Sequence, residues 1–230
     1  MQRPRSWRYV FALLCLISLP AHVSADDEYA RPDLLVEPAS LGTLASEPGF
    51  VLLDVRSAKD FAAGHLAGAL HVDPNTWAKA FSDGSDREAW SQRIASLGID
   101  DNSTVVVYDA ISNKDAARVW WMFRYWGVDG VRLLNGGWPG AQAARLEVET
   151  EAAAPPEPSE FAAQPHDDRL ATKAELLASL SGKTIQIVDA RSEAEHCGVA
   201  PLANRRAGAI PGAKHLDWIE LVDPNTGRFK

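Results

Sequence analysis

The sequence predicts an α/β protein made of two homologous units, each a mainly parallel sheet flanked by helices, with the second unit truncated. Two observations support this. Short apolar runs alternate with helix-compatible stretches, the βαβ rhythm of a parallel sheet covered on both faces. A turn motif also occurs twice. The first copy is Asp54-Val55-Arg56-Ser57, followed by the glycine-rich stretch 64–71. The second copy is Asp189-Ala190-Arg191-Ser192, followed by 208–215.

The first unit contains four apolar runs that predict strands, at residues 50–53, 69–72, 105–108 and 131–134. Between them, residues 57–63 and 87–97 have helix-compatible composition. Residues 115–126 place apolar side chains at spacings of three and four, which predicts a helix with one buried face. The members of that face are Ala116, Val119, Trp120, Phe123 and Trp126.

The second unit begins after a loop rich in Ala, Pro and Glu at residues 149–160, which contains three prolines and is typical of a linker. Thr172 with Glu175 three residues later predicts a helix N-terminus, and Gly182 predicts its end. Residues 185–188 predict a first strand, and 215–216 a further short one. We therefore divide the chain into a leader (1–25), a first unit (30–147), a linker (148–165) and a second unit (166–230).

The repeat also predicts that the second unit stops early. In the first unit the strand 105–108 ends at Asp109, which lies 41 residues after Gly68. The same interval counted from Gly212 reaches about position 253, beyond Lys230. We therefore expect the matching strand end of the second unit to lie outside this sequence.

The leader has the pattern of a secretory signal peptide, since three arginines precede the apolar run 9–20, which Val23-Ser24-Ala25 follows. The run of about 12 residues is short for a bilayer span, which needs roughly 20, so a retained membrane anchor is the weaker alternative. We expect a protein exported across the inner membrane to the periplasm, with no stable membrane insertion after cleavage.

Charge and cysteine content exclude several classes. Formal charge is −8, and removing a leader with three arginines and no acidic residue makes it −11, which disfavours nucleic acid as a partner. Cys197 is the only cysteine after residue 25, so no intramolecular disulfide is expected. The histidines form no metal-ligand spacing and Gly136-Gly137 lacks the phosphate-binding fingerprint, so we expect neither metal nor cofactor.

Five motifs, in order, make the chain from about residue 31 to Lys230 resemble the tandem-domain rhodanese family, which includes the thiosulfate and 3-mercaptopyruvate sulfurtransferases. They are Asp54-x-Arg56, Gly64-His65-Leu66-x-Gly68-Ala69, the strand that ends at Asp109, Arg118-Val119-Trp120-Trp121-Met122-Phe123-Arg124, and Leu133-Leu134-Asn135-Gly136-Gly137-Trp138.

The resemblance implies transfer of sulfane sulfur from thiosulfate or 3-mercaptopyruvate to cyanide or a thiol through a cysteine persulfide. It implies that the first domain is inactive and carries Asp109 at the nucleophile position, with the catalytic cysteine near position 253. No catalytic residue is then assigned within this chain. Arg191 resembles the arginine near the bound anionic substrate, and a strand-end salt bridge with Asp189 is an equally supported interpretation.

Three alternatives stay open. Cys197 follows Glu195-His196 and is a candidate reactive thiol, although its position before the repeated turn favours an incidental surface thiol. The chain is either a fragment of an active sulfurtransferase, which we favour, or a non-catalytic binding or interaction module. A phosphatase with this architecture is disfavoured, because residues 26–230 contain no loop with a cysteine followed by a phosphate-holding arginine.

Overall fold

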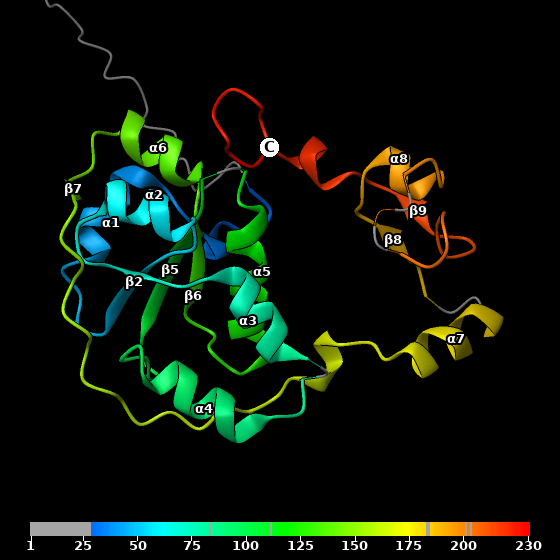
Figure 1. Ribbon diagram of the computed structural model, residues 1–230, viewed down its shortest axis with the longest axis horizontal. Coiled ribbons are helices and arrows are strands. Elements are labelled where there is room, and N and C mark those ends of the chain that lie inside the picture. Colours follow the sequence, from blue (N-terminus) through cyan, green and yellow to red (C-terminus); the bar gives the residue numbers. More distant parts are fainter. Residues whose placement is uncertain (1–28, 83, 111, 183–184, 201, 203) are drawn as a thin grey trace, which may run out of the picture.

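The computed structural model describes residues 29–230 except 83, 111, 183–184, 201 and 203, and its first unit is built on a parallel five-stranded sheet (Figure 1). The strands follow the order β1-β6-β5-β2-β4. Their bounds are Leu35–Val36 (β1), Phe50–Asp54 (β2), Ala69–His71 (β4), Thr104–Tyr108 (β5) and Val131–Leu134 (β6). The four strands predicted from apolar runs are confirmed, and all pair in parallel.

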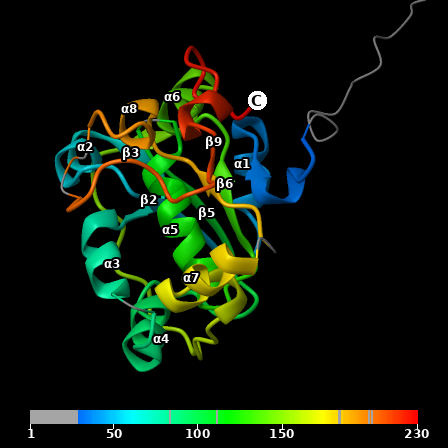
Figure 2. The ribbon, with the colours of Figure 1, turned by 90° about the vertical axis from the view of Figure 1, so that its right-hand side faces the viewer.

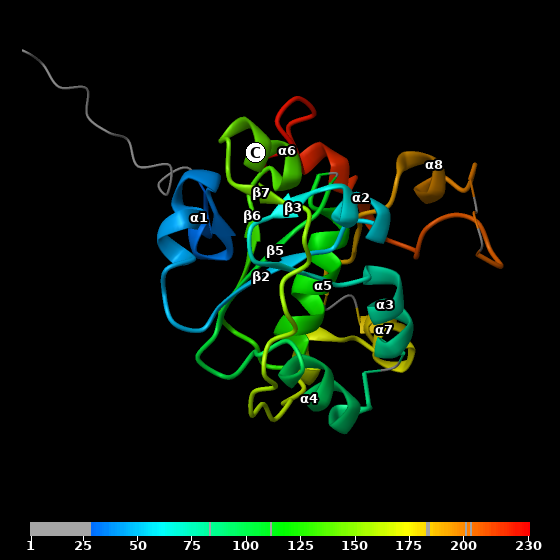
Figure 3. The same ribbon diagram turned by 60° about the vertical axis from the view of Figure 1, so that its left-hand side comes forward.

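Helices cover both faces of this sheet, as the βαβ rhythm predicted (Figure 3). On one face, Val105 and Val107 of β5 belong to a core with α3 (Pro74–Phe81), α4 (Arg87–Ala95) and α5 (Lys114–Tyr125). On the other, Val106 packs in a core with α1 (Pro38–Leu44), α2 (Ala58–Ala63) and α6 (Gly137–Ala143). Successive β5 side chains thus alternate between two cores, and the strand is buried on both sides.

Aromatic side chains fill the larger core, in agreement with the prediction for α5. Trp126, directly after α5, is fully buried and its ring stacks on Trp90 at 5.5 Å between centroids. Trp120 is partly buried and donates from Nε1 to the carbonyl of Val131 at 3.0 Å, which ties α5 to β6. These contacts fix α5, and with it the loop that precedes it.

The chain between the two units lies against the first one. Two short strands, β3 (His65–Leu66) and β7 (Val148–Glu149), pair antiparallel. Farther on, the Ser159 N–H donates to the carbonyl of Ala95 at 2.9 Å, and Ala163 is fully buried. A 3₁₀ helix, η3 (Asp167–Arg169), precedes α7 (Lys173–Gly182). At the start of α7, the Glu175 carboxylate accepts the hydroxyl of Thr172, and the backbone N–H of Glu175 donates to the same hydroxyl oxygen. These two bonds confirm the predicted capping pair.

The second unit contains α7, β8 (Val188–Asp189), α8 (Glu193–His196), β9 (Lys214–His215) and a 3₁₀ helix, η4 (Trp218–Leu221) (Figure 1). β8 and β9 pair in parallel, as β2 and β4 do. The prediction of a strand over 185–188 was wrong in its extent, since the described strand begins at Val188. Among the described residues, β8 pairs with one strand, whereas β2 pairs with two. Because β8 has fewer backbone hydrogen-bond partners, a shorter stretch of its chain is held in strand conformation.

The predicted leader lies outside the described residues. Within residues 29–230, apart from the six undescribed positions, no helix combines the length and apolar character needed to cross a bilayer.

Candidate functional site

A cavity of about 620 Å³ lies at the carboxyl ends of β2, β4 and β5 in the first unit. Chain order reverses direction at β2, since β4 pairs on one side of it and β5 on the other. In open α/β sheets ligands bind outside the carboxyl ends of the strands at such a point. The walls include Arg56, His71, Asp109, Lys114 and, from the second unit, Trp218.

Asp109 follows β5 and its carboxylate occupies the N-terminus of α5. One oxygen accepts the backbone N–H of Asn113 at 3.1 Å, and the other accepts those of Asp115 and Ala116 at 2.9 and 3.1 Å. The residue is 3 % exposed. A helix N-terminus favours an anion through its free N–H groups and its dipole. Here a side chain of the protein supplies that negative charge.

The backbone around Asp109 is held from a second side by the start of α6. The Trp138 N–H donates to the Asp109 carbonyl at 2.8 Å. Gly137 has φ +52°, and a Cβ there would lie 2.7 Å from the same carbonyl oxygen. Only glycine permits both this conformation and this approach. The glycine pair in the motif 133–138 therefore lets α6 pack against the loop after β5.

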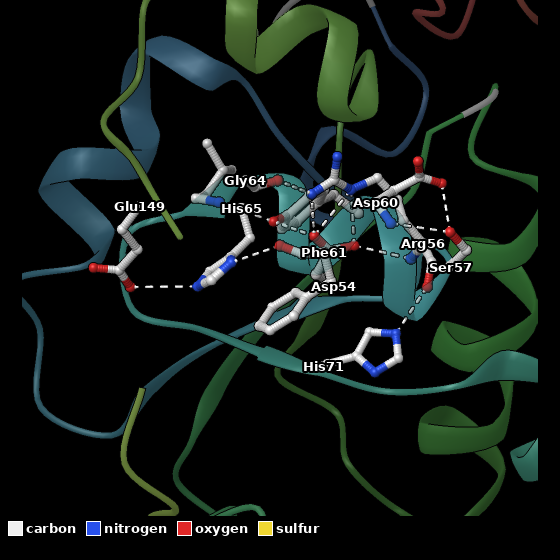
Figure 4. A network of polar contacts seen from close by, with 11 residues as sticks. Asp54, Arg56, Ser57, Asp60, Phe61, Gly64, His65, His71 and Glu149 are labelled. Carbon is white, nitrogen blue, oxygen red and sulfur yellow. Dashed lines mark hydrogen bonds and ion pairs between the residues drawn. The ribbon is translucent and has the colours of Figure 1, made fainter. Parts of the chain in front are cut away.

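Arg56, which lines the cavity, forms a buried ion pair with Asp54 (Figure 4). Arg56 donates from Nε and Nη2 to Asp54, the shortest distance being 2.6 Å, and from Nη2 to the carbonyl of Gly64 at 2.6 Å. The guanidinium also lies 3.8 Å from the ring of Trp138. Burial works against the charge, but the Asp54 carboxylate outweighs it and raises the pKa of Arg56.

Tyr108 completes this network from β5. Its hydroxyl donates to Asp54 at 2.7 Å and accepts the N–H of Leu66 at 3.1 Å. Burial, and then the negative charge of Asp54, raise the pKa of Tyr108 far above its usual value, so the hydroxyl stays protonated. With this proton in place, Tyr108 joins β2, β3 and β5 through one oxygen atom.

The second unit contains the same set of contacts around Asp189 and Arg191. Arg191 donates to Asp189 at 2.9 and 2.7 Å and to the carbonyl of Gly208 at 3.0 Å, as Arg56 does to Asp54 and Gly64. His215 contacts the Arg191 carbonyl at 2.8 Å, as His71 contacts that of Arg56. The recurring turn motif in the sequence thus corresponds to a recurring hydrogen-bond network.

The two networks differ in exposure and in one partner. The Arg191 side chain is 37 % exposed, whereas that of Arg56 is 4 % exposed. His196 lies 3.0 Å from Asp189, where the first unit has the Tyr108 hydroxyl on Asp54. The hydrogen bond from Arg191, then that from His196, lowers the pKa of Asp189 well below its usual range against the effect of burial. Arg191 therefore forms the predicted salt bridge with Asp189, and its role in binding an anionic substrate stays a prediction.

Cys197, the candidate reactive thiol, follows α8 and is exposed. Its backbone N–H donates to the carbonyl of Glu193 at 2.8 Å, so it lies at the C-terminal end of a four-residue helix. It does not join Asp109 in the loop after β5. Among the described residues, no group of three or more His, Cys, Asp and Glu side chains is arranged to hold a metal ion.

Comparisons with known proteins match these features to one family. A family model described as the Rhodanese-like domain matches residues 37–144. A thiosulfate sulfurtransferase from Corynebacterium glutamicum is 35 % identical over 225 residues, which cover 90 % of this chain and 72 % of the relative. One from Azotobacter vinelandii is 32 % identical, over 86 % of this chain and 74 % of the relative. The chain belongs to the rhodanese family.

The solved structures agree with this family assignment. The 3-mercaptopyruvate sulfotransferase SseA from Escherichia coli, described by its rhodanese fold, superposes with a TM-score of 0.73 at 28 % identity. The match covers 86 % of this chain and 79 % of that one. The predicted fold class, a mainly parallel sheet flanked by helices, is therefore confirmed as a rhodanese fold.

Sequence reasoning missed several residues of this rhodanese site. Tyr108 was read only as the end of an apolar strand, and its hydroxyl bond to Asp54 spans 54 residues. Asn113 and Trp218 were also missed, although Asn113 has the left-handed φ of +61° that asparagine tolerates well. An asparagine directly before a helix was the signal available for it.

Proposed function

We propose that the chain is part of an exported rhodanese-type sulfurtransferase that moves sulfane sulfur from thiosulfate or 3-mercaptopyruvate to cyanide or a thiol. In this proposal the first unit, residues 30–147, has no catalytic role. The second unit, residues 166–230, is an incomplete rhodanese-like domain whose cysteine nucleophile follows Lys230 in the complete protein. The thiosulfate sulfurtransferases among its relatives support the reaction class.

The observation that carries the proposal is the position of the Asp109 carboxylate. It lies where the backbone N–H groups at the N-terminus of α5 would receive an anionic sulfur donor, and it already accepts those of Asn113, Asp115 and Ala116. A negative carboxylate repels an anion and cannot store sulfur as a persulfide. This supports Asp109 as an inactive replacement of the nucleophile.

The unpaired edge of β8 supports our proposal that the nucleophile lies outside the described residues. In the first unit, β5 pairs along β2 from Phe50 to Asp54, and Asp109 follows directly. Across the described chain, β8 pairs with β9 alone, and the side that corresponds to β5 carries no strand. A strand there would bring the residue after it close to Asp189 and Arg191. The cysteine that we propose belongs at that position.

The chemistry of the proposed site is a two-step displacement. The cysteine thiolate attacks the outer sulfur of thiosulfate, the S–S bond of the donor breaks, and sulfite leaves with the electron pair. Cyanide then attacks the outer sulfur of the persulfide, giving thiocyanate and returning the thiolate. A loop between a strand end and a helix start suits this step, because its N–H groups favour both the thiolate and the anionic donor.

A non-catalytic interaction module is the second candidate. The described residues contain one free cysteine, Cys197, and it lies on the surface after α8 rather than after a strand. A rhodanese unit with Asp109 at the loop after β5 can still present a surface to a partner. Export to the periplasm, which rests on the pattern of residues 1–25, belongs to both candidates.

Sequencing the gene beyond the Lys230 codon, followed by mass spectrometry of the complete protein after incubation with thiosulfate, tests the proposal. We expect an open reading frame with a cysteine about 23 residues farther on. We also expect that cysteine to gain one sulfur atom, and its replacement by serine to prevent the gain. A stop codon directly after Lys230 would contradict the proposal and favour the interaction module.

A further inference from the structure

Residues 217–230 form a compact segment, which we call the clasp. It begins with η4, and Val222 then pairs antiparallel with Phe229. Asp223 closes the turn between them, since its side chain accepts the N–H groups of Asn225 and Thr226 at 2.7 and 3.0 Å. Val222 is 2 % exposed. The clasp is therefore an ordered element although it contains little regular secondary structure.

The clasp lies on the first unit, beside α6 (Figures 1 and 2). The side-chain amide of Asn113 donates to the Gly227 carbonyl at 3.1 Å. The Phe229 N–H donates to the Asn135 side chain at 3.0 Å, and Arg228 pairs with Glu37 at 2.8 Å. A fourth bond runs from the Tyr29 hydroxyl to the Phe229 carbonyl at 2.9 Å.

Three of these anchors occupy equivalent places in the fold. Glu37 follows β1, Asn135 follows β6 and Asn113 is in the loop after β5, so all lie at the carboxyl ends of neighbouring strands. Asn113 and Asn135 are 1 % and 0 % exposed, so their amides are buried and held in fixed directions. The clasp thus covers the carboxyl ends of β1, β6 and β5, beside the cavity at the ends of β2, β4 and β5.

The Asn113 side chain points at the clasp because the two residues before α5 have an unusual backbone conformation. Ser112 and Asn113 both have left-handed φ values, +57° and +61°. A preceding asparagine normally turns its side chain onto the helix N–H groups, but Asn113 makes no such cap. The Asp109 carboxylate accepts those N–H groups instead, including that of Asn113 itself. The Asn113 side chain is left to bind Gly227.

We propose that Asn113, Asn135 and Glu37 of the first unit form a receptor for the clasp, and that Asp109 is the positioning residue that leaves the Asn113 amide to bind Gly227. The partner of this surface is a segment of the same chain. Asn113, four residues after Asp109, thereby helps to join the two units. This role is independent of whether the complete protein transfers sulfur.

Hydrogen–deuterium exchange of the full protein tests the proposal by comparing the peptide over residues 217–230 with a peptide over α4. Asn113→Gly retains the left-handed backbone and removes only the amide donor, and Asn113→Asp retains the shape but offers Gly227 no donor. Ser112→Gly is the matched control at the neighbouring left-handed residue. We expect both Asn113 variants to speed exchange in the clasp about 2- to 10-fold, from the loss of one hydrogen bond. Exchange in α4 and in the control should not change.

Asp109→Asn separates positioning from simple helix capping. If Asp109 acts through Asn113, this variant speeds clasp exchange, and adding Asn113→Gly to it has no further effect. Full additivity of the two effects would overturn the role of Asp109. Unchanged clasp exchange in both Asn113 variants would overturn the receptor itself. If Asp109→Asn also speeds exchange in α4, the first unit has loosened as a whole, and that result counts against a specific positioning role.

Discussion

The carboxylate of Asp109 lies 2.9 Å from the backbone nitrogen of Asp115, inside the first turn of α5. This contact is the basis of our proposal that the first unit has no catalytic role. The N-terminus of a helix favours an anion, and here the Asp109 carboxylate is that anion. It already accepts the N–H groups of Asn113 and Ala116, which would otherwise be available to an anionic substrate. The first unit has the rhodanese fold, and the proposed function assigns no sulfur transfer to this loop.

The buried and the exposed copies of the Asp–Arg pair should differ in their effect on stability. Arg56→Ala leaves Asp54 buried without its counter-ion, and we expect a loss of about 3–5 kcal/mol in the free energy of unfolding. Arg191→Ala removes the same hydrogen bonds from a side chain that is 37 % exposed and screened by solvent, and we expect a much smaller loss. Urea unfolding followed by circular dichroism measures both. Equal losses of stability in the two variants would contradict our explanation that the burial of Asp54 and Arg56 makes their pair the more important one.

The network around Asp189 should make the stability of the second unit depend on acid. The pKa of Asp189 is lowered in the folded protein by Arg191 and His196, so the folded state favours the carboxylate. Its stabilising contribution is fully present above the unfolded pKa of about 4, and it is lost progressively as the pH falls from there toward the lower pKa of the folded state. Asp189→Asn should remove this part of the pH dependence in urea unfolding between pH 7 and pH 3.

Asp33→Asn is the control for that experiment, since Asp33 pairs with Arg31 on an exposed surface. We expect this variant to follow the wild-type pH profile closely. A profile for Asp189→Asn that also overlays the wild type would show that the Asp189 network does not contribute to acid sensitivity.

Introducing a thiol at position 109 of the first unit should not create sulfurtransferase activity. Asp109→Cys puts sulfur at the N-terminus of α5, but the position is 3 % exposed and the start of α6 contacts its backbone. We expect no thiocyanate formation and slow reaction with iodoacetamide, because both require access. The variant is made together with Cys197→Ala, so that alkylation reports position 109 within residues 26–230. Thiocyanate formation by this double variant would mean that Asp109 alone suppresses catalysis.

Much of the first unit could be predicted from local pattern. Strands such as 105–108 are buried on both faces and therefore read as continuous apolar runs. The helix over α5 was visible because Val119 and Phe123 repeat at helical spacing. By contrast, α3 was missed although Asp73 caps it and Pro74 begins it, so the signal was available.

The clasp and its receptor could not be predicted in this way. The bond between Asn113 and Gly227 joins residues 114 positions apart, and that between Tyr29 and Phe229 joins residues 200 apart. Neither side chain belongs to a periodic pattern. Contacts of this kind depend on how the strand ends are brought together, which the sequence pattern does not contain. For the same reason the extent of β8 was overestimated, since its pairing depends on strands distant in the chain.

The central claim is that residues 1–230 do not carry the sulfur-transferring group, and thiocyanate formation tests it most directly. The purified protein is incubated with thiosulfate and cyanide beside its Cys197→Ala variant. We predict no turnover above the uncatalysed rate for either, because Asp109 occupies the loop of the first unit and Cys197 lies after α8 on the surface. Turnover that disappears in Cys197→Ala would contradict the account and place the persulfide on Cys197.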